Sequence, residues 1–231
     1  MIDKEIAQKR RARQMAIAIL ARAREAGIPD KYLRLKREVI ANVLDPKFHG
    51  GPKEGVPKFA DSIYDDPNFL LKKNFITIDG GDGISRQLAS FAILFRIIAY
   101  DKRGQYINCD SLFHKFQSIN ATAEITRNDL AEEMKSYDVL FVSEFDKYRF
   151  KPQFEHGSFF DEILADRMNY GRPTIISFVN PIISKQLESD EDYVQLSAEG
   201  KMDAGCGRYL AWLGIKANTT DSVLRVRVRS I

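Results

Sequence analysis

The sequence has few of the residues that covalent cross-links and metal sites require. Its 231 residues include two cysteines and three histidines, with no Cys-x-x-Cys pair. Cys109 and Cys206 lie far apart, so we expect reduced thiols in a cytoplasmic protein rather than a disulfide framework. The shortage of thiol and imidazole ligands argues against a zinc site, and we predict no metal ligands.

Long apolar runs and hydrolase motifs are also missing. No run approaches the roughly eighteen apolar residues that span a bilayer, so we expect no membrane partner. The N-terminus lacks the continuous apolar segment and cleavage site of a secretory signal. Without a Gly-x-Ser-x-Gly motif, serine-hydrolase chemistry has no support. The chain is 44% hydrophobic, which is sufficient for one substantial core.

Charge is unevenly distributed, although the net charge is only +3. Residues 1–24 hold seven basic and two acidic side chains, and residues 224–231 alternate arginines with mostly apolar residues. Both stretches are candidates for contact with nucleic acid or a partner. A solvated helix face and the exposed face of an edge strand explain them equally well. The basic residues are Lys4, Lys9, Arg10, Arg11, Arg13, Arg22, Arg24, Arg225, Arg227 and Arg229.

The first third of the sequence predicts helices followed by a linker. Residues 3–26 are rich in helix formers and are followed by Gly27 and Pro29, which end helices. A second helix is expected over 30–44. Because residues 45–67 are rich in proline and glycine, we expect mostly loop there.

The remainder alternates apolar strands with helical patterns, which predicts an α/β fold with a parallel sheet flanked by helices. The predicted strands are 75–78, 104–108, 139–142, 174–178 and 223–228. The predicted helices are 88–100, 111–119, 127–135, 159–170 and 184–187. The predicted domains are 1–29, a basic helical arm that docks on a partner; 30–72, a helix and linker; and 73–231, the core.

The most informative stretch, FITIDGGDGISRQLA, runs from Phe75 to Ala89. Its strand–glycine turn–helix order is the setting of the phosphate-binding motif G-x-x-x-x-G-K-[ST]. Against that motif, Ser85 replaces the second glycine, Arg86 the lysine and Gln87 the Ser/Thr that holds magnesium. The amides of such a turn still suit an anion, but magnesium binding is expected to be weak or absent. The candidate nucleotide-binding residues are Gly80, Gly81, Asp82, Gly83, Ile84, Ser85, Arg86 and Gln87.

Further candidates follow the third and fourth strands, because ligands bind beyond the carboxyl ends of parallel strands. YDVLFVSEFD has the form of a Walker B element, in which Glu144 suits the polarisation of water and Ser143 replaces the aspartate that orders magnesium. Asp146 is a second carboxylate within reach. Ser177 and Asn180 are candidates for a polar residue near a terminal phosphate. Arg208, in a glycine-flanked turn, is a candidate finger for a neighbour's nucleotide.

The ordered segments resemble the AAA+ helicase loaders of the DnaC, DnaI and IstB group. The resemblance runs from about Ala23 to the C-terminus through AREAGIPDKYL, IDGGDGISRQLAS, RGQYINCDSLFHKF and SYDVLFVSEFD. Its most specific part is FDEILADRMNYGRPTIISFVNP, an Asp-Arg followed by Arg-Pro-Thr before an apolar strand. The resemblance implies an AAA+, P-loop NTPase-like core preceded by a helical extension.

The same resemblance implies an ATP-regulated homo-oligomer that contacts single-stranded DNA and delivers a replicative hexameric helicase to it. In that group an N-terminal region grips the helicase, a role that falls here to residues 3–26. The departures at Ser85, Arg86, Gln87 and Ser143 predict weak or absent ATP hydrolysis and leave open whether ATP or ADP binds. A loader with a degenerate site would suit a phage or mobile element that diverts its host's helicase.

Three functions remain open on the sequence. The first is a helicase-loader-like protein that acts by binding. The second is an active, divergent AAA+ ATPase of the loader or transposition-regulator type, with Glu144 and Arg208 as catalytic residues. The third is an adaptor or inhibitor of the helicase that binds neither nucleotide nor DNA.

Overall fold

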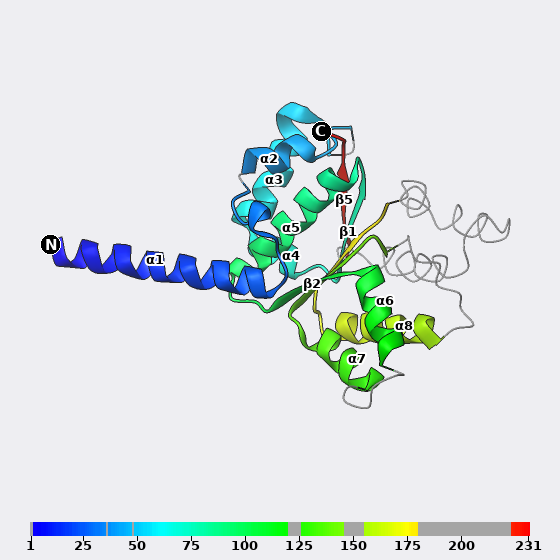
Figure 1. The fold of residues 1–231 in the computed structure, drawn as a ribbon. Helices are drawn as coiled ribbons and strands as arrows, with labels where there is room; N and C mark the ends of the chain where they lie inside the picture. The colour runs from blue at the N-terminus through cyan, green and yellow to red at the C-terminus, as the bar shows by residue number, and fades with distance from the viewer. Residues whose placement is uncertain (1, 36, 48, 120–125, 146–154, 180–222) are drawn as a thin grey trace.

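The computed structural model describes residues 2–35, 37–47, 49–119, 126–145, 155–179 and 223–231. Its centre is a sheet of five parallel strands in the order β2-β3-β4-β1-β5 (Figure 1). The strands are β1 (Phe75–Gly80), β2 (Gly104–Asn108), β3 (Val139–Ser143), β4 (Thr174–Ser177) and β5 (Val223–Val228). All five strands that the apolar runs predict are therefore confirmed, as is their parallel pairing.

Helices cover both faces of the sheet, as predicted (Figure 1). One face packs against the end of α1 (Ile2–Glu25), η1 (Asp30–Tyr32), α2 (Arg37–Val43), α3 (Val56–Asp65), α4 (Pro67–Leu71) and α5 (Gly83–Ala99). The other packs against α6 (Cys109–Ser118), α7 (Arg127–Ser136) and α8 (Glu155–Asn169). Side chains alternate across each strand, so Ile76 and Ile78 enter the first core and Phe75 enters the second. The expected helix over 184–187 lies outside the described residues.

The expected loop over 45–67 is wrong, because much of it is helical. A π-helical turn, η2 (Gly51–Gly55), leads directly into α3, and α4 follows. Pro57 and Pro67 lie in the first turns of α3 and α4, where a missing N–H removes no helical hydrogen bond. Val56, Ala60 and Ile63 form the buried face of α3. The prolines therefore start helices here rather than break them.

The single helix expected over 30–44 is also wrong, since the segment divides into η1 and α2. Tyr32 closes η1 and is buried, with its ring stacked on Phe91 at a centroid distance of 4.7 Å. Its hydroxyl donates to the Gln87 side chain at 2.8 Å. Farther on, the Tyr64 hydroxyl donates to the carbonyl oxygen of Leu35 at 3.3 Å, which holds the connection. Tertiary contacts from α5 and α3 thus interrupt a sequence of reasonable helix propensity.

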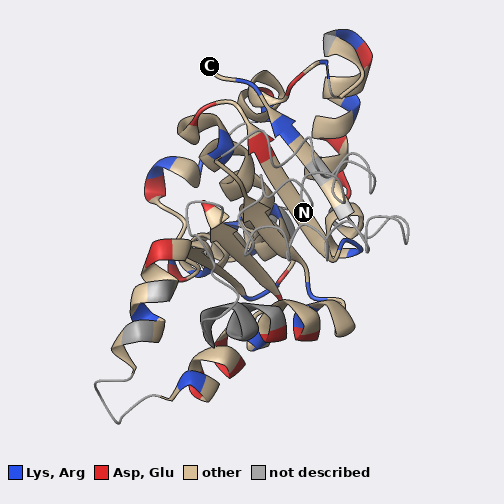
Figure 2. Cartoon of the chain, turned by 90° about the vertical axis from the view of Figure 1, so that its right-hand side faces the viewer, with Lys and Arg blue, Asp and Glu red and all other residues tan. Residues whose placement is uncertain are grey.

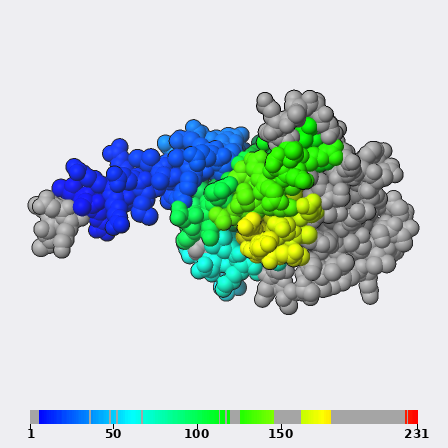
Figure 3. Space-filling model, turned by 90° about the horizontal axis from the view of Figure 1, so that it is seen from below, coloured from blue at the N-terminus to red at the C-terminus, as the bar shows by residue number. Residues whose placement is uncertain are grey.

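The predicted N-terminal helix is confirmed as α1, which projects from the body as an arm (Figures 1 and 3). Only its last turns join the core, through Leu20, Ala23 and the following Ala26. Among the described residues, no helix is both long enough and apolar enough to cross a membrane. The body itself shows acidic and basic positions interspersed along its helices (Figure 2).

The outer edge of β5 is closed by the chain that follows α2. Leu44 forms an antiparallel bridge with Val228, and the Arg229 N–H donates to the Val43 carbonyl at 2.8 Å. Arg227 is engaged inside the fold, in an ion pair with Asp79 at 3.2 Å. These contacts protect the edge from pairing with other chains. They also bind Arg227 within the fold rather than leaving it free on a nucleic-acid surface.

The segment that resembles the loaders most specifically contains Arg167, which is fully buried and holds this part of the fold together. Its Nε donates to Thr174 Oγ1 at 2.9 Å, and its other nitrogens donate to the carbonyl oxygens of Met134, Tyr137 and Pro173 at 3.0, 2.7 and 2.7 Å. Burial lowers the pKa of this guanidinium to about 9, so it remains charged at neutral pH. The Asp-Arg and Arg-Pro-Thr pieces therefore join α7, α8 and β4.

Candidate functional site

The glycine turn lies at the carboxyl end of the sheet, between β1 and α5. Strand β1 ends at Gly80 and α5 begins at Gly83, so only Gly81 and Asp82 separate them. The sequence predicted a helix from residue 88, which is wrong by five residues at its start. In G-x-x-x-x-G-K-[ST] four residues follow the first glycine before the second. Here Gly83 and Ile84, which occupy the last two of these positions, are already helical.

Asp82 is the reason that the helix begins early. Its carboxylate accepts from the Ser85 N–H at 2.7 Å, which is the hydrogen bond of a helix N-cap. This backbone hydrogen bond lowers the pKa of Asp82, and the N–H groups of Ile231 and Ile84 add to the effect. The first-turn amide that would face a bound phosphate therefore already holds an anionic side chain.

Arg86 is directed into its own turn. The side chain is buried, and its Nη1 donates to the carbonyl oxygens of Gly80 and Gly81 at 3.0 and 2.9 Å. A guanidinium held this way cannot reach outward to a phosphate without giving up both bonds. Gln87, at the position of the Ser/Thr, accepts from the Tyr32 hydroxyl.

The end of β5 crosses the turn at close range. Gly80 has φ +79°, and a Cβ there would lie 2.6 Å from the Val228 carbonyl oxygen. Gly81 has φ +53°, and a Cβ there would lie 2.9 Å from the Arg229 carbonyl group. Both glycines are required by their positive φ and by this approach. The glycines therefore serve the packing of β1 against β5.

A polar cluster lies at the carboxyl ends of β2, β3 and β4. The buried Ser143 Oγ is 3.1 Å from the Tyr106 hydroxyl and 3.3 Å from Asn108 Nδ2. The same Asn108 nitrogen donates to Glu144 Oε2 at 3.4 Å. The Glu144 N–H donates to Ser177 Oγ at 3.0 Å, and Glu144 has the unusual φ of +56°. The structure thus brings together three of the predicted residues, Ser143, Glu144 and Ser177.

Sequence reasoning missed Tyr106 and Asn108 in this cluster. Their signal was their place near the end of a predicted strand, but only the parallel register, with Asn108 opposite Ser143, brings them to the site. Asp146, Asn180 and Arg208 lie outside the described residues. In the part of the chain that the structure describes, no group of three or more His, Cys, Asp or Glu side chains is arranged to hold a metal ion.

The turn does not fit the phosphate-and-magnesium arrangement of the motif that it resembles in outline. The helix N-terminus is capped by a carboxylate, and the basic side chain is bonded to the turn. Ser143 offers a neutral hydroxyl in place of a magnesium-ordering carboxylate. Asp82 would also repel an approaching phosphate. The hydrogen-bonding groups of the turn are thus paired with one another, Asp82 with Ser85 and Arg86 with the carbonyl oxygens of the glycines.

No family model and no curated protein matches the sequence. Solved structures do match its fold. The DnaC helicase loader aligns with a TM-score of 0.54 and 15% identity, over 86% of this chain and 99% of that one. DnaI aligns with a TM-score of 0.50 and 13% identity, over 84% and 95% of the two chains.

The replication initiator DnaA, solved with AMPPCP and single-stranded DNA, aligns with a TM-score of 0.52 and 14% identity. The match covers 75% of this chain but only 46% of that DnaA chain. Together with the parallel five-stranded sheet, these likenesses confirm the AAA+, P-loop NTPase-like fold that the sequence predicted. At such identities they establish the fold alone.

Proposed function

We propose that this chain is a DNA-replication protein of the helicase-loader type that acts by binding, with little or no ATP hydrolysis. The observation that carries the proposal is the extent of its likeness to DnaC, which spans nearly the whole loader chain. DnaA, by contrast, has more than half of its chain outside the match. The partners are a replicative hexameric helicase and single-stranded DNA.

The projecting part of α1 is the proposed helicase-binding arm. Ile6 and Ile17 are 45% and 58% exposed, which is unusual for large aliphatic side chains. They lie eleven residues apart, or about three helical turns, and so share one face of α1. The same face also carries Arg10 and Arg13 between the two isoleucines, so it suits a partner groove that accepts both aliphatic and basic side chains.

The glycine turn supports binding without turnover. The capped helix end and the inward Arg86 leave no basic side chain in the turn to neutralise a transferred phosphoryl group. Any bound ATP or ADP is therefore expected to be weakly held and slowly turned over. Ile84 is 61% exposed beside the turn and offers an apolar contact for a homo-oligomer assembled through this face.

The arm is tested by measuring the affinity of the chain for a purified hexameric helicase. The variant Ile6→Ser/Ile17→Ser is expected to lose binding at least tenfold, because about 2 kcal/mol or more resides in such buried anchors. Met15→Gln is the matched control, since Met15 is 62% exposed on the opposite face of α1. Equal affinity of the double variant and the wild type would remove α1 from the proposal. A truncation should stop near residue 18, because Leu20 and Ala23 belong to the core.

A second candidate function is an active, divergent ATPase. It is favoured by Glu144, whose carboxylate is held by Asn108 at the strand end where such enzymes polarise water. Turnover that Glu144→Gln abolishes would establish this function. We expect no turnover above background in the wild type, and helicase binding without DNA binding would instead indicate an adaptor or inhibitor.

A further inference from the structure

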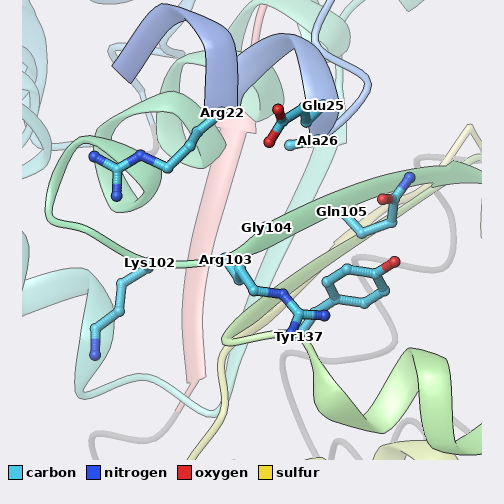
Figure 4. A pocket seen from close by; sticks show the side chains of 8 residues that line it. All are labelled: Arg22, Glu25, Ala26, Lys102, Arg103, Gly104, Gln105 and Tyr137. Atoms are coloured by element: carbon cyan, nitrogen blue, oxygen red, sulfur yellow. The ribbon is translucent and has the colours of Figure 1, made fainter. Parts of the chain in front are cut away.

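A recess lies at the opposite end of the sheet from the glycine turn. It is a pocket of about 240 Å³ between the C-terminal end of α1 and the start of β2 (Figure 4). Arg22, Glu25 and Ala26 line it from α1 and the residue after it. On the other side it is lined by residues 102–105 and Tyr137. The Tyr106 N–H donates to the Ala26 carbonyl at 2.7 Å and fixes the two walls together.

The pocket is lined by three cationic side chains, Arg22, Lys102 and Arg103, and by one carboxylate, Glu25. Arg22 also forms an ion pair with the exposed Asp101, but its side chain remains 32% exposed. Lys102 makes no hydrogen bond or ion pair with any described residue. The pocket therefore has a positive excess and one ammonium group available to a ligand.

Arg103 is held in place before any ligand binds. Its backbone N–H donates to Asp138 Oδ2 at 2.7 Å, and its Nη2 donates to Ser136 Oγ at 3.3 Å. The guanidinium lies 5.1 Å from the centroid of the Tyr137 ring. That ring is fixed in turn, because its hydroxyl donates to Glu133 Oε1 at 2.9 Å. A planar, preorganised guanidinium is well suited to a phosphate group.

The pocket opens at the base of the basic arm. Arg11 is exposed and lies eleven residues before Arg22, which places both on one face of α1 about 16 Å apart. Elsewhere the body mixes acidic and basic positions (Figure 2). The C-terminal end of α1 meets the body beside the edge strand β2 (Figure 1), so Arg11 on the arm and Arg22 at the pocket lie on one path from solvent to that strand.

We propose that this pocket binds a backbone phosphate of single-stranded DNA, with the strand continuing along the Arg11–Arg22 face of α1. The inference rests on the proposed function for its ligand, and it adds a site remote from the glycine turn. A recess of this size admits one phosphate and its sugar, whereas a duplex would need a broad groove. Glu25 lies at the pocket wall, but Arg22, Lys102 and Arg103 outnumber it, so the net charge of the lining favours a single phosphate.

The test is binding of a fluorescent oligothymidylate to the full chain, measured by anisotropy from 50 to 300 mM salt. Lys102→Gln/Arg103→Gln is the test variant, and Lys58→Gln/Lys72→Gln, which removes two exposed lysines of α3 and the end of α4, is the matched control. For single strands each lost phosphate contact lowers the salt slope by about 0.7, so the test variant, which loses the one phosphate held in this pocket, should lose about 0.7. At 0.1 M salt that slope corresponds to an affinity loss of about fivefold. Lys102→Glu, which disturbs no described contact, should weaken binding at least as much as the loss of one contact.

The outcomes separate this inference from the function on which it rests. Wild-type chain that binds no oligothymidylate refutes DNA binding altogether. Wild-type binding with equal losses in test and control variants refutes the pocket but leaves DNA binding intact. A loss confined to the Lys102 and Arg103 variants, with photo-cross-links from a 5-iodouracil strand to Tyr137, supports the site.

Discussion

Two alanine substitutions three residues apart should change stability in opposite directions. In Gly80→Ala the new Cβ would lie 2.6 Å from the Val228 carbonyl oxygen at φ +79°. A left-handed backbone costs an ordinary residue about 1–2 kcal/mol, and overpacking against backbone adds about 1–3 kcal/mol. We therefore expect the free energy of unfolding to fall by about 2–5 kcal/mol. At roughly 2–4 °C per kcal/mol, the melting temperature falls by about 4–20 °C.

Gly83→Ala should do the reverse. Gly83 starts α5 without a positive φ, and its Cβ would meet only Arg86 Nη2 at 3.9 Å. Replacing glycine with alanine in an unstrained helix adds about 0.4–1 kcal/mol by restricting the unfolded chain. Urea unfolding of both variants, with circular dichroism at 222 nm, measures the difference. Equal losses in the two variants would refute a helix that begins at residue 83 and restore a longer, phosphate-loop-like turn.

Two further predictions concern buried charge and pH. Arg167→Lys should lower the free energy of unfolding by about 3–5 kcal/mol, because one ammonium cannot satisfy the four acceptors that the guanidinium holds. A loss below 1 kcal/mol in urea unfolding would contradict the role of Arg167 in joining α7, α8 and β4. Burial lowers the pKa of His49, whose Nε2 lies 3.2 Å from the Arg227 N–H nitrogen. A histidine with a lowered folded pKa stabilises the fold above its unfolded pKa of about 6.5, and this contribution is lost as pH falls toward the folded pKa. The urea concentration at the unfolding midpoint should therefore decrease as the pH is lowered below 6.5, and this decrease should be smaller in His49→Gln. The same pH dependence in the variant and the wild type would show that His49 does not cause it.

Strands β1, β3 and β4 were predictable because each is a short, mainly apolar run between breakers and is buried on both faces. Strands β2 and β5 mix polar with apolar residues, so their signal in the sequence is weaker. The helices of the linker were not, because Pro57 and Pro67 signal a break in sequence but occupy first turns in space. Only the burial of Val56, Ala60 and Ile63 against α5 identifies α3 as a core helix.

The candidate site was predictable in place but not in chemistry. The order strand, glycine turn, helix located it, and the missing lysine predicted weak turnover. The cap at Asp82 was visible in the sequence as an aspartate three residues before Ser85, yet the outline of the phosphate motif suggested a loop there. The inward bonds of Arg86 and the approach of β5 depend on contacts between distant segments, which no local pattern contains.

The central claim is a loader-type protein that binds its helicase without a nucleotide cycle. It is tested most directly by the affinity of the immobilised chain for a purified replicative hexamer without nucleotide, with ADP, and with ATP and magnesium. The structure predicts specific binding whose dissociation constant changes less than about twofold, or about 0.4 kcal/mol, among the three conditions. Absence of binding, or a change of tenfold or more with ATP and magnesium, would contradict the account.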